Sequence, residues 1–204
     1  ISRIASEIKK NYELDLKYID IGGGFYGGLE DKPKFQNYME VISRELDKVF
    51  DKEKVVLIVE PGTSLVSSPF SFVTSVIDVK KTTVNNFVVT DGSRINIDPL
   101  MNKSKYFYSI KYGDNSKRNV IKSQIISGFT CMENDRILKI ENQPQLLIGD
   151  KIIYEKVGAY TIALSPLFIS YFPDVYVKNN EEIYKVRKKW TAKEFLMKSE
   201  LYSR

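Results

Sequence analysis

Three consecutive glycines, Gly22, Gly23 and Gly24, follow a strand-like segment of the chain, Tyr18-Ile19-Asp20-Ile21. Glycine has no Cβ, so the N–H groups of such a loop are free to close around an anion such as a phosphate. A run of glycines also marks a plain tight turn, which is its more frequent use. Whether the loop binds an anion or is only a tight turn must therefore be judged from the residues around it.

Reactive side chains stand at three further places. Glu60 directly follows a second apolar segment, and Cys131 precedes Asp135 by four residues. Tyr160 follows a Gly-Ala pair. Each has a purely structural interpretation as well: an acid paired with a nearby lysine, a small buried apolar cysteine, and a core tyrosine. A thiol is nevertheless suited to proton transfer, because its unperturbed pKa lies within reach of neutral pH.

The first third of the chain has an α/β pattern that positions the glycines and Glu60. Apolar periodicity predicts a helix around residues 4–8, a strand over 17–22, an amphipathic helix over 33–50 and a strand over 55–59. In such a unit the two strands are parallel and the crossover is right-handed. Both strands are apolar at consecutive positions, as expected when both faces of a sheet are covered. The glycines and Glu60 are thus expected at one sheet edge, at the carboxyl ends of the strands.

From residue 69 onward, short β-branched and aromatic runs are separated by Gly, Asn, Asp and Pro. This pattern is typical of an antiparallel β-sandwich or barrel. The expected strands are residues 70–79, 87–91, 106–111, 120–127, 145–148, 151–155, 174–177 and 183–186. Thr191 and Glu194 have the spacing of a capping box, which predicts a short helix near the end of the chain.

The composition excludes several classes of protein. The net charge of +5 is mild for 204 residues, and the lysines are scattered among acids, so no nucleic-acid partner is expected. The single cysteine excludes an intrachain disulfide and fits a reducing, cytoplasmic compartment. Neither a membrane span nor a signal peptide is predicted, and no metal site. Because the chain begins at Ile1 rather than Met, we expect it to belong to a longer protein.

In their order and spacing, the motifs Gly-Gly-Gly, Glu-Pro-Gly, Gly-Phe-Thr-Cys and Gly-Ala-Tyr resemble the C-terminal part of the fold-type III pyridoxal-phosphate decarboxylases. This is the family of the diaminopimelate and ornithine decarboxylases, and the resemblance covers essentially the whole chain. It implies that residues 1–68 are the C-terminal part of an alanine-racemase-like (β/α)8 TIM barrel. Residues 69–204 are then an antiparallel β-sandwich or barrel domain with a short C-terminal helix.

The resemblance implies that the cofactor is pyridoxal 5'-phosphate and that the barrel residues bind it. The three glycines supply the phosphate cradle, and Gly62 belongs to the same site. Glu60 faces the pyridine nitrogen and keeps it protonated, which makes the ring a stronger electron sink. The hydroxyl of Tyr160 closes over the phosphate.

The resemblance further implies a homodimer whose active sites are shared across the interface, with an amino acid as substrate. Cys131, with Asp135 four residues later, reaches into the partner subunit's site and helps to reprotonate the decarboxylated carbon. In the family an acid directly follows this cysteine and holds the substrate's distal amine. Here that position is Met132, and Glu133 comes one place later.

Other substrate contacts also differ from the family pattern. The arginine that usually follows Glu-Pro-Gly is Thr63 here. The Arg-Pro segment with which diaminopimelate decarboxylases clamp a substrate carboxylate has Asp98 at its arginine position and Met101 at its tyrosine position. An arginine fork binds a carboxylate through two parallel hydrogen bonds, which neither threonine nor aspartate imitates. Arg94 is the candidate that compensates.

The family's Schiff-base lysine and ring-stacking histidine come from the N-terminal half of the barrel. This chain has no histidine and no lysine in the matching context, so we expect it to be inactive alone. For the full-length protein we predict pyridoxal-phosphate-dependent decarboxylation of an amino acid, in a specialised biosynthetic pathway and with a diverged substrate pocket. The alternative is a catalytically silent homologue that acts as a binding or regulatory module. A racemase of related barrel fold is a third reading, but it is not expected to carry the Cys131 and Tyr160 elements.

Overall fold

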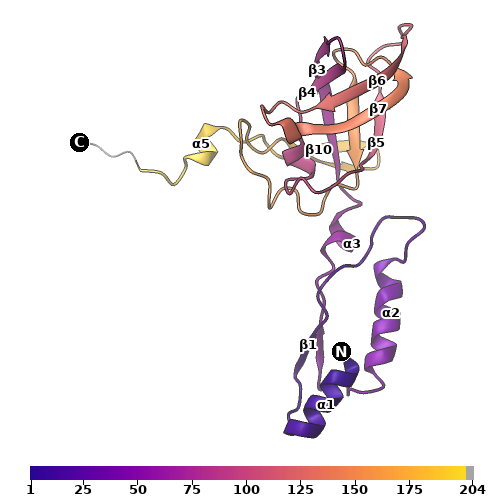
Figure 1. Cartoon of the computed structure of the whole chain (residues 1–204). Coiled ribbons are helices and arrows are strands. Elements are labelled where there is room, and N and C mark those ends of the chain that lie inside the picture. Colours follow the sequence, from indigo (N-terminus) through magenta and orange to yellow (C-terminus); the bar gives the residue numbers. More distant parts are fainter. Residues whose placement is uncertain (201–204) are drawn as a thin grey trace. The chain divides into compact units, whose positions relative to one another are not determined.

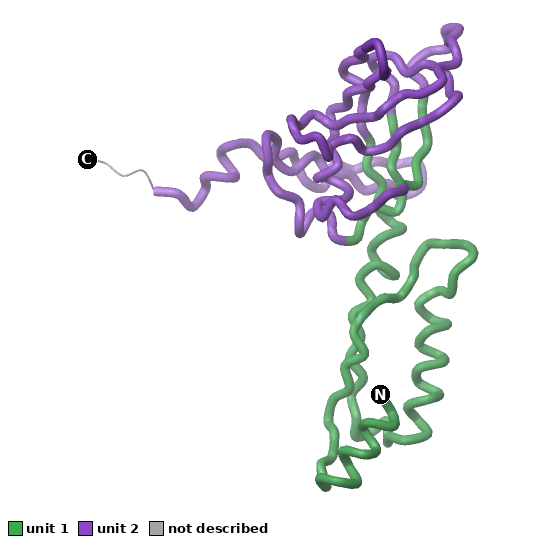
Figure 2. The backbone as a smooth tube through the Cα atoms, in the orientation of Figure 1, with its two compact units in different colours: residues 1–73, 106–111, 152–159 green, residues 74–105, 112–151, 160–204 purple. Residues whose placement is uncertain are grey.

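The computed structural model describes residues 1–200, which divide into two compact units (Figure 2). The first unit contains residues 1–73, 106–111 and 152–159, and the second contains residues 74–105, 112–151 and those from 160 onward. The units are thus built from interleaved segments of the chain. The predicted domain boundary after residue 68 stays a prediction.

The elements are labelled in Figure 1. In chain order they are α1 (Ser2–Tyr12), β1 (Tyr18–Asp20), α2 (Phe35–Leu46), β2 (Val56–Ile58), α3 (Gly62–Val66), β3 (Ser71–Lys81), β4 (Asn86–Thr90), α4 (Arg94–Ile97), β5 (Phe107–Lys111), β6 (Val120–Ser127), the 3-10 helix η1 (Glu133–Asp135), β7 (Arg136–Pro144), β8 (Lys151–Glu155), β9 (Val175–Asn179), β10 (Glu182–Arg187) and α5 (Ala192–Phe195).

The first unit contains the predicted strand–helix–strand arrangement. Strands β1 and β2 pair in parallel, with Tyr18 opposite Val56, as the sequence predicted. The ring of Phe25, directly after the glycine loop, meets the rings of Phe35 and Tyr38 on α2 edge-on at 5.5 and 5.3 Å between centroids. Such edge-to-face pairs are favourable for aromatic rings. The helix therefore anchors the residue that follows the loop.

The two strands of this small sheet are covered on one face only. Ile19 is buried, with 6% of its surface exposed, whereas Tyr18, Val56 and Ile58 are 64%, 54% and 40% exposed. The expectation that both faces are covered is therefore wrong for the described chain. The physical reason is the size of the sheet, since no element of residues 1–200 lies over its second apolar face.

The larger sheet has six strands in the order β5-β8-β3-β4-β6-β7 and is curled (Figure 1). Its pairs β3–β4 and β6–β7 are antiparallel, as predicted, but β4 and β6 run in parallel, with Val88 opposite Ile126. The prediction of a purely antiparallel sheet is thus wrong at this pair. Between the two strands the chain passes through α4 and β5, and such a long connection allows a return in the same direction. The apolar core of this part of the chain includes Val76, Val88, Ile95, Ile97, Ile126, Ile140, Leu146, Ile152 and Tyr154.

One predicted strand is wrong, and one observed strand was missed. Residues 145–148 form a loop because their N–H groups donate to side chains: Leu146 to Gln124 Oε1 at 2.9 Å and Leu147 to Asp150 Oδ2 at 2.7 Å. The missed strand is β7, which pairs with β6 on the side away from β4 and whose charged and amide residues concealed it in the sequence. The other predicted strands and helices are present, including α5 with its capping box.

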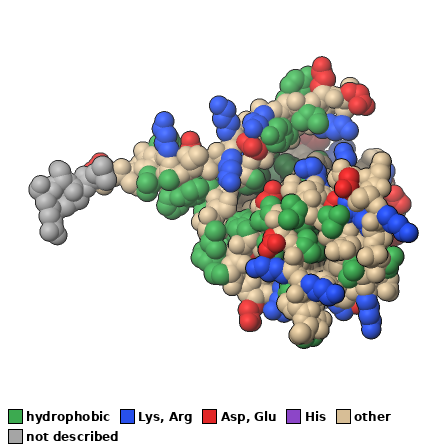
Figure 3. Space-filling model, turned by 90° about the horizontal axis from the view of Figure 1, so that it is seen from above, with side chains coloured by type: hydrophobic (Ala, Val, Ile, Leu, Met, Phe, Trp, Pro, Cys, Tyr) green, Lys and Arg blue, Asp and Glu red, His purple; other side chains and the backbone are tan. Residues whose placement is uncertain are grey.

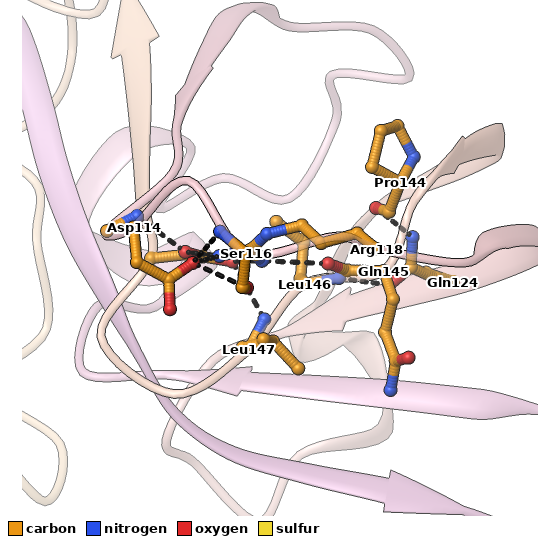
Figure 4. A network of polar contacts seen from close by, with 10 residues as sticks. Asp114, Ser116, Arg118, Gln124, Pro144, Gln145, Leu146 and Leu147 are labelled. Atoms are coloured by element: carbon orange, nitrogen blue, oxygen red, sulfur yellow. Dashed lines mark hydrogen bonds and ion pairs between the residues drawn. The ribbon is translucent and has the colours of Figure 1, made fainter.

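A buried ion pair joins two turns of the second unit (Figure 4). Arg118 and Asp150 are 6% and 1% exposed, and Arg118 Nη2 also bonds Asp114 Oδ1 at 2.8 Å. Asp150 accepts further hydrogen bonds from the N–H groups of Gly113 and Leu147, at 2.8 and 2.7 Å. The hydrogen bond from Arg118 to Asp150 raises the pKa of the guanidinium above its ordinary value. Turn 113–118 and loop 145–150 are therefore held as one piece.

Two kinds of feature are absent from residues 1–200. None of the helices described there is long and apolar enough to cross a membrane. Over the same residues, no three Cys, Asp or Glu side chains gather in a way that would hold a metal ion.

Candidate functional site

The glycine loop closes against the end of β2, as the sequence predicted. The N–H of Gly22 donates to Asp20 Oδ1 at 2.8 Å, and the carbonyl of Gly22 accepts from the N–H of Glu60 at 2.7 Å. Gly22 and Gly24 have φ angles of 66° and 88°, in the left-handed region that favours glycine. These bonds place the loop and Glu60 side by side.

Gly23 is required for a different reason. A Cβ at this residue would lie 2.7 Å from the carbonyl oxygen of Glu60, a distance that real contacts do not show. Gly23 and Gly24 are exposed, and within the described residues their N–H groups have no protein acceptor. Two free amides in a glycine turn form a concavity suited to an anion. The loop therefore has the features of an anion cradle in addition to those of a turn.

A second glycine pair, Gly27 and Gly28, was missed by the sequence analysis. A Cβ on Gly27 would lie 2.3 Å from Ser64 Cα on α3, and one on Gly28 would lie 2.4 Å from Ser68 Cβ. These glycines let the loop pack closely against α3 and against Ser68, two residues beyond its end. The signal in the sequence was the repeated Gly-Gly after Phe25-Tyr26.

Glu60 presents an uncommitted carboxylate at the end of β2. Its side chain is exposed and takes part in none of the ion pairs found among residues 1–200. The interpretation as an acid paired with a lysine therefore has no support. Gly62 begins α3, and a Cβ there would meet nothing within 4 Å, so packing does not require glycine at this position.

The second group of candidate residues lies in the loop between β6 and β7. Asp135 is 2% exposed, and its carboxylate accepts hydrogen bonds from Ser93 Oγ at 2.9 Å and from the N–H of Arg94 at 2.7 Å. On the same carboxylate, the N–H and hydroxyl of Thr130 donate at 3.0 and 2.6 Å. Cys131 is exposed on this loop. Asp135 thus fastens the residue before Cys131 to the start of α4.

Met132 and Glu133 follow Cys131 on the same loop. Met132 is half-buried, and its carbonyl accepts from the N–H of Asp135 at 3.0 Å. Glu133 begins η1 and is exposed. Of these two side chains, only that of Glu133 offers an accessible charge next to the cysteine.

Arg94 has a largely internal set of partners. Its side chain is 15% exposed and bonds Asp98 Oδ2 through Nε at 3.0 Å and through Nη2 at 2.9 Å. The remaining bonds reach the carbonyls of Lys103 at 2.8 Å and Asn134 at 3.3 Å. A guanidinium has five N–H donors, so one is left after these four bonds. Two of the guanidinium nitrogens of Arg94, Nε and Nη2, thus bind Asp98.

Tyr160 follows a closely packed glycine, Gly158, by two residues. A Cβ on Gly158 would fall 1.8 Å from the carbonyl oxygen of Val66, and the N–H of Gly158 donates to Ser67 O at 3.1 Å. Tyr160 has a φ of 58° and is 64% exposed, which is not the environment of a core tyrosine. The candidate residues thus fall into two groups, with Gly22–Gly24 and Glu60 in the first unit and the Cys131 loop and Tyr160 in the second.

Two family models match the chain. Residues 1–67 match the pyridoxal-dependent decarboxylase, pyridoxal binding domain. Residues 41–158, more than half of the 204 residues, match the pyridoxal-dependent decarboxylase, C-terminal sheet domain. The chain belongs to the pyridoxal-dependent decarboxylase family. This finding confirms the resemblance seen in the sequence motifs and identifies pyridoxal 5'-phosphate as the family's cofactor.

Individual decarboxylases are similar over most of this chain. Ornithine decarboxylase of Mus musculus is 28% identical over 92% of the chain, which corresponds to 44% of the mouse protein. Diaminopimelate decarboxylase of Helicobacter pylori is 31% identical over 77% of the chain and 38% of its own length. The chain therefore spans less than half the length of these relatives.

Solved decarboxylase structures share the fold. A crystal structure of diaminopimelate decarboxylase superposes with a TM-score of 0.77 at 20% identity, covering 96% of this chain and 50% of the other. The Helicobacter pylori diaminopimelate decarboxylase complexed with L-lysine gives a TM-score of 0.72 at 25% identity, covering 96% and 48%. The predicted combination of barrel part and sheet domain agrees with these likenesses.

The glycine loop of this decarboxylase-family chain fits a phosphate group. The amides of Gly23 and Gly24 are open, and any side chain at Gly23 would collide with Glu60 O. The Glu60 carboxylate beside the loop is a suitable partner for a pyridinium N–H, since a charged acceptor strengthens a hydrogen bond. The residues present thus match the chemistry of pyridoxal phosphate.

Proposed function

We propose that the longer protein to which this chain belongs decarboxylates an amino acid with the help of pyridoxal 5'-phosphate. The observation that carries the proposal is the pairing of the open glycine amides with the free carboxylate of Glu60, joined by the bond from Glu60 N to Gly22 O of 2.7 Å. The glycines after β1 are then the partners of the phosphate, and Glu60 after the neighbouring strand β2 is the partner of the pyridine nitrogen. Family membership adds the reaction class.

The residues of this chain hold the cofactor. Gly23 and Gly24 would donate their N–H groups to the phosphate, and Gly62 would belong to the same site. Glu60 would be the partner of the pyridine nitrogen and would favour its protonated form. Bound pyridoxal phosphate supplies an electron sink for the electron pair that remains when the substrate carboxylate leaves as CO₂.

Cys131 is proposed to act in a homodimer. Its thiol is exposed on a loop that Asp135 fastens, and it would donate a proton to the substrate carbon in the partner subunit's site. Asp135 itself is buried and accepts four hydrogen bonds, so we assign it the role of holding the loop rather than of touching substrate.

The substrate is proposed to differ from diaminopimelate. The Nε and Nη2 atoms of Arg94 already donate to Asp98. The guanidinium therefore has no pair of free N–H groups with which to bind both oxygens of a distal substrate carboxylate. Met132 replaces the family's acid, which leaves Glu133 as the nearest carboxylate for a substrate amine. An amino acid with a distal amine and a single carboxylate fits this set of residues better.

The test uses the full-length protein with pyridoxal phosphate, incubated with a panel of amino acids while the absorbance spectrum and CO₂ release are followed. We expect a cofactor absorbance band and CO₂ from one substrate with a single carboxylate. The variant Gly23→Ala should lose the band, because the new methyl group meets Glu60 O, whereas Gly113→Ala should keep it, because its methyl group makes an ordinary contact of 3.5 Å. A full band in Gly23→Ala would refute the cradle.

A second function is favoured by one relative. Antizyme inhibitor 2 of Xenopus laevis is 29% identical over 82% of the chain. The changed positions Thr63, Asp98 and Met132 are compatible with a homologue that keeps the fold as a regulatory module. Absence of both the absorbance band and CO₂ release in the full-length protein would favour this role, and retention of either would exclude it.

A further inference from the structure

The loop that carries Cys131 is fastened to the rest of the second unit at two adjoining points. The first is the Asp135 carboxylate, which binds the hydroxyl of Ser93 and the main-chain N–H of Arg94. The second is the carbonyl of Asn134, which accepts from Arg94 Nη1 at 3.3 Å. One residue, Arg94, thus holds this loop through both its main chain and its side chain.

The guanidinium of Arg94 is fixed by partners on the other side. Asp98 is 2% exposed and accepts from the N–H of Lys103 at 3.0 Å as well as from Arg94 Nε and Nη2. Two charge-assisted hydrogen bonds from the guanidinium to one carboxylate oxygen, Asp98 Oδ2, are stronger than bonds between neutral groups and favour a fixed geometry. The carbonyl of Lys103 accepts a further bond from Nη2 at 2.8 Å. The side chain of Arg94 therefore joins segment 98–103 to the loop 130–135.

We infer that Arg94 is a positioning residue for the Cys131 loop, and that the Arg94–Asp98 pair sets the place from which the thiol acts. The catalytic consequence rests on the proposed function, whereas the loop fastening stands on the contacts alone. Arg94 does not touch substrate in this role. Its contribution is to keep a surface thiol in one position, which proton transfer within hydrogen-bond reach requires.

The test compares two buried ion pairs of the same unit. In Arg94→Gln combined with Asp98→Asn, neither charge is left buried without its partner, a change that would otherwise destabilise the fold. The control is Arg118→Gln combined with Asp150→Asn, which removes a pair that is 6% and 1% exposed and lies in other turns. Both double variants and the unchanged chain are compared at the same temperature.

The first readout is amide hydrogen exchange at Gly128, Thr130 and Asp135, whose N–H groups all donate within the loop. The variant removes the bond from Arg94 Nη1 to Asn134 O and the bonds to Asp98 that hold the guanidinium in place, which should speed exchange at these amides by about tenfold. The control should speed exchange only near residues 113–118 and 147–150. Equal exchange of the loop amides in the two double variants would overturn the inference.

The second readout is steady-state kinetics of the full-length protein. We expect kcat to fall by about tenfold in the Arg94/Asp98 variant with KM within about twofold, since the thiol acts after substrate has bound. The control should keep both constants. A wild-type kcat in the Arg94/Asp98 variant of an active enzyme would overturn the positioning role. If the wild type releases no CO₂ at all, the proposed function fails, and the exchange measurement alone decides the fastening.

Discussion

Burial separates the carboxylates of this chain into two kinds. Asp98, Asp135 and Asp150 are 2%, 2% and 1% exposed, and each accepts several hydrogen bonds from N–H groups of other segments. A buried charge has to be compensated in this way, because an unpaired one would be costly. Glu60 and Glu133 are exposed and have no such partners. The first kind holds loops together, and the second kind remains available to ligands.

The contribution of Asp114 to the folding stability depends on pH. Hydrogen bonds from Ser116 and then from Arg118 lower the pKa of its carboxyl below the ordinary value. A lowered pKa adds stability above the unfolded-state value of about 3.9, and this stability is lost as pH falls through the folded-state pKa. We therefore expect Asp114→Asn to unfold at lower denaturant concentration than wild type at pH 7, with a smaller difference between the two proteins at pH 3.

The measurement is urea denaturation of both proteins at the two pH values. Glu30→Gln serves as control, since Glu30 is exposed and outside every network described for residues 1–200. A difference between Asp114→Asn and wild type that is the same at pH 7 and pH 3 would show that the carboxylate charge does not matter.

At the scale of elements, the joint between α3 and β3 holds the segment that leads to Tyr160. Ser67 Oγ donates to the carbonyl of Lys156 at 2.8 Å, and the N–H of Val157 donates to Phe70 O at 3.2 Å. Gly158 completes the contact because only a residue without Cβ fits against Val66 O. The segment 156–158 is therefore packed on 66–70 rather than connected loosely.

Gly158→Ala tests this joint. The added methyl group would lie 1.8 Å from Val66 O and 2.6 Å from the Phe70 ring, so the segments have to separate. Overpacking of this kind destabilises a fold by about 1–3 kcal/mol. We expect a lower melting temperature in a calorimetric or circular-dichroism melt. Gly113→Ala is the matched control. Equal melting temperatures for the two variants would contradict the close packing of segment 156–158 on residues 66–70.

At the scale of the whole molecule, described residues 1–200 leave many large apolar side chains exposed. One set lies on β1 and β2, where Tyr18, Val56 and Ile58 share the uncovered face of the sheet. Another lies on the hairpin of β9 and β10, where Tyr176, Ile183 and Val186 are 51%, 65% and 59% exposed. Figure 3 shows apolar side chains at several places on one face of the molecule. Exposed apolar surface and open strand edges favour association with other chains.

We expect this chain to aggregate more readily than the full-length protein, because uncovered strands of the small sheet pair with other copies. Light scattering of both proteins at one concentration measures the difference. Val56→Thr with Ile58→Thr should lower the scattering of the chain, while Val84→Thr should not, although Val84 is 83% exposed. Val84 lies between β3 and β4 and not on the small sheet. Cleaner behaviour of the chain than of the full-length protein would contradict this prediction.

The sequence by itself determined the features that depend on neighbouring residues. Helix and strand periodicity, the Thr191 capping box and the parallel pairing of β1 with β2 were predictable, because these signals lie within a few residues or within one strand–helix–strand unit. The glycine loop beside Glu60 followed from the same unit. Family membership was visible in the order of the motifs.

The tertiary structure decided the features that join distant parts of the chain. The bonds of Asp135 to Ser93 and Arg94 span 42 and 41 residues, and the parallel pairing of β4 with β6 depends on the path between them. The sequence suggested Arg94 as a substrate ligand, but the structure directs its fork to Asp98. Burial and partner choice are properties of the packed chain, because a side chain's free energy depends on groups that only folding brings near.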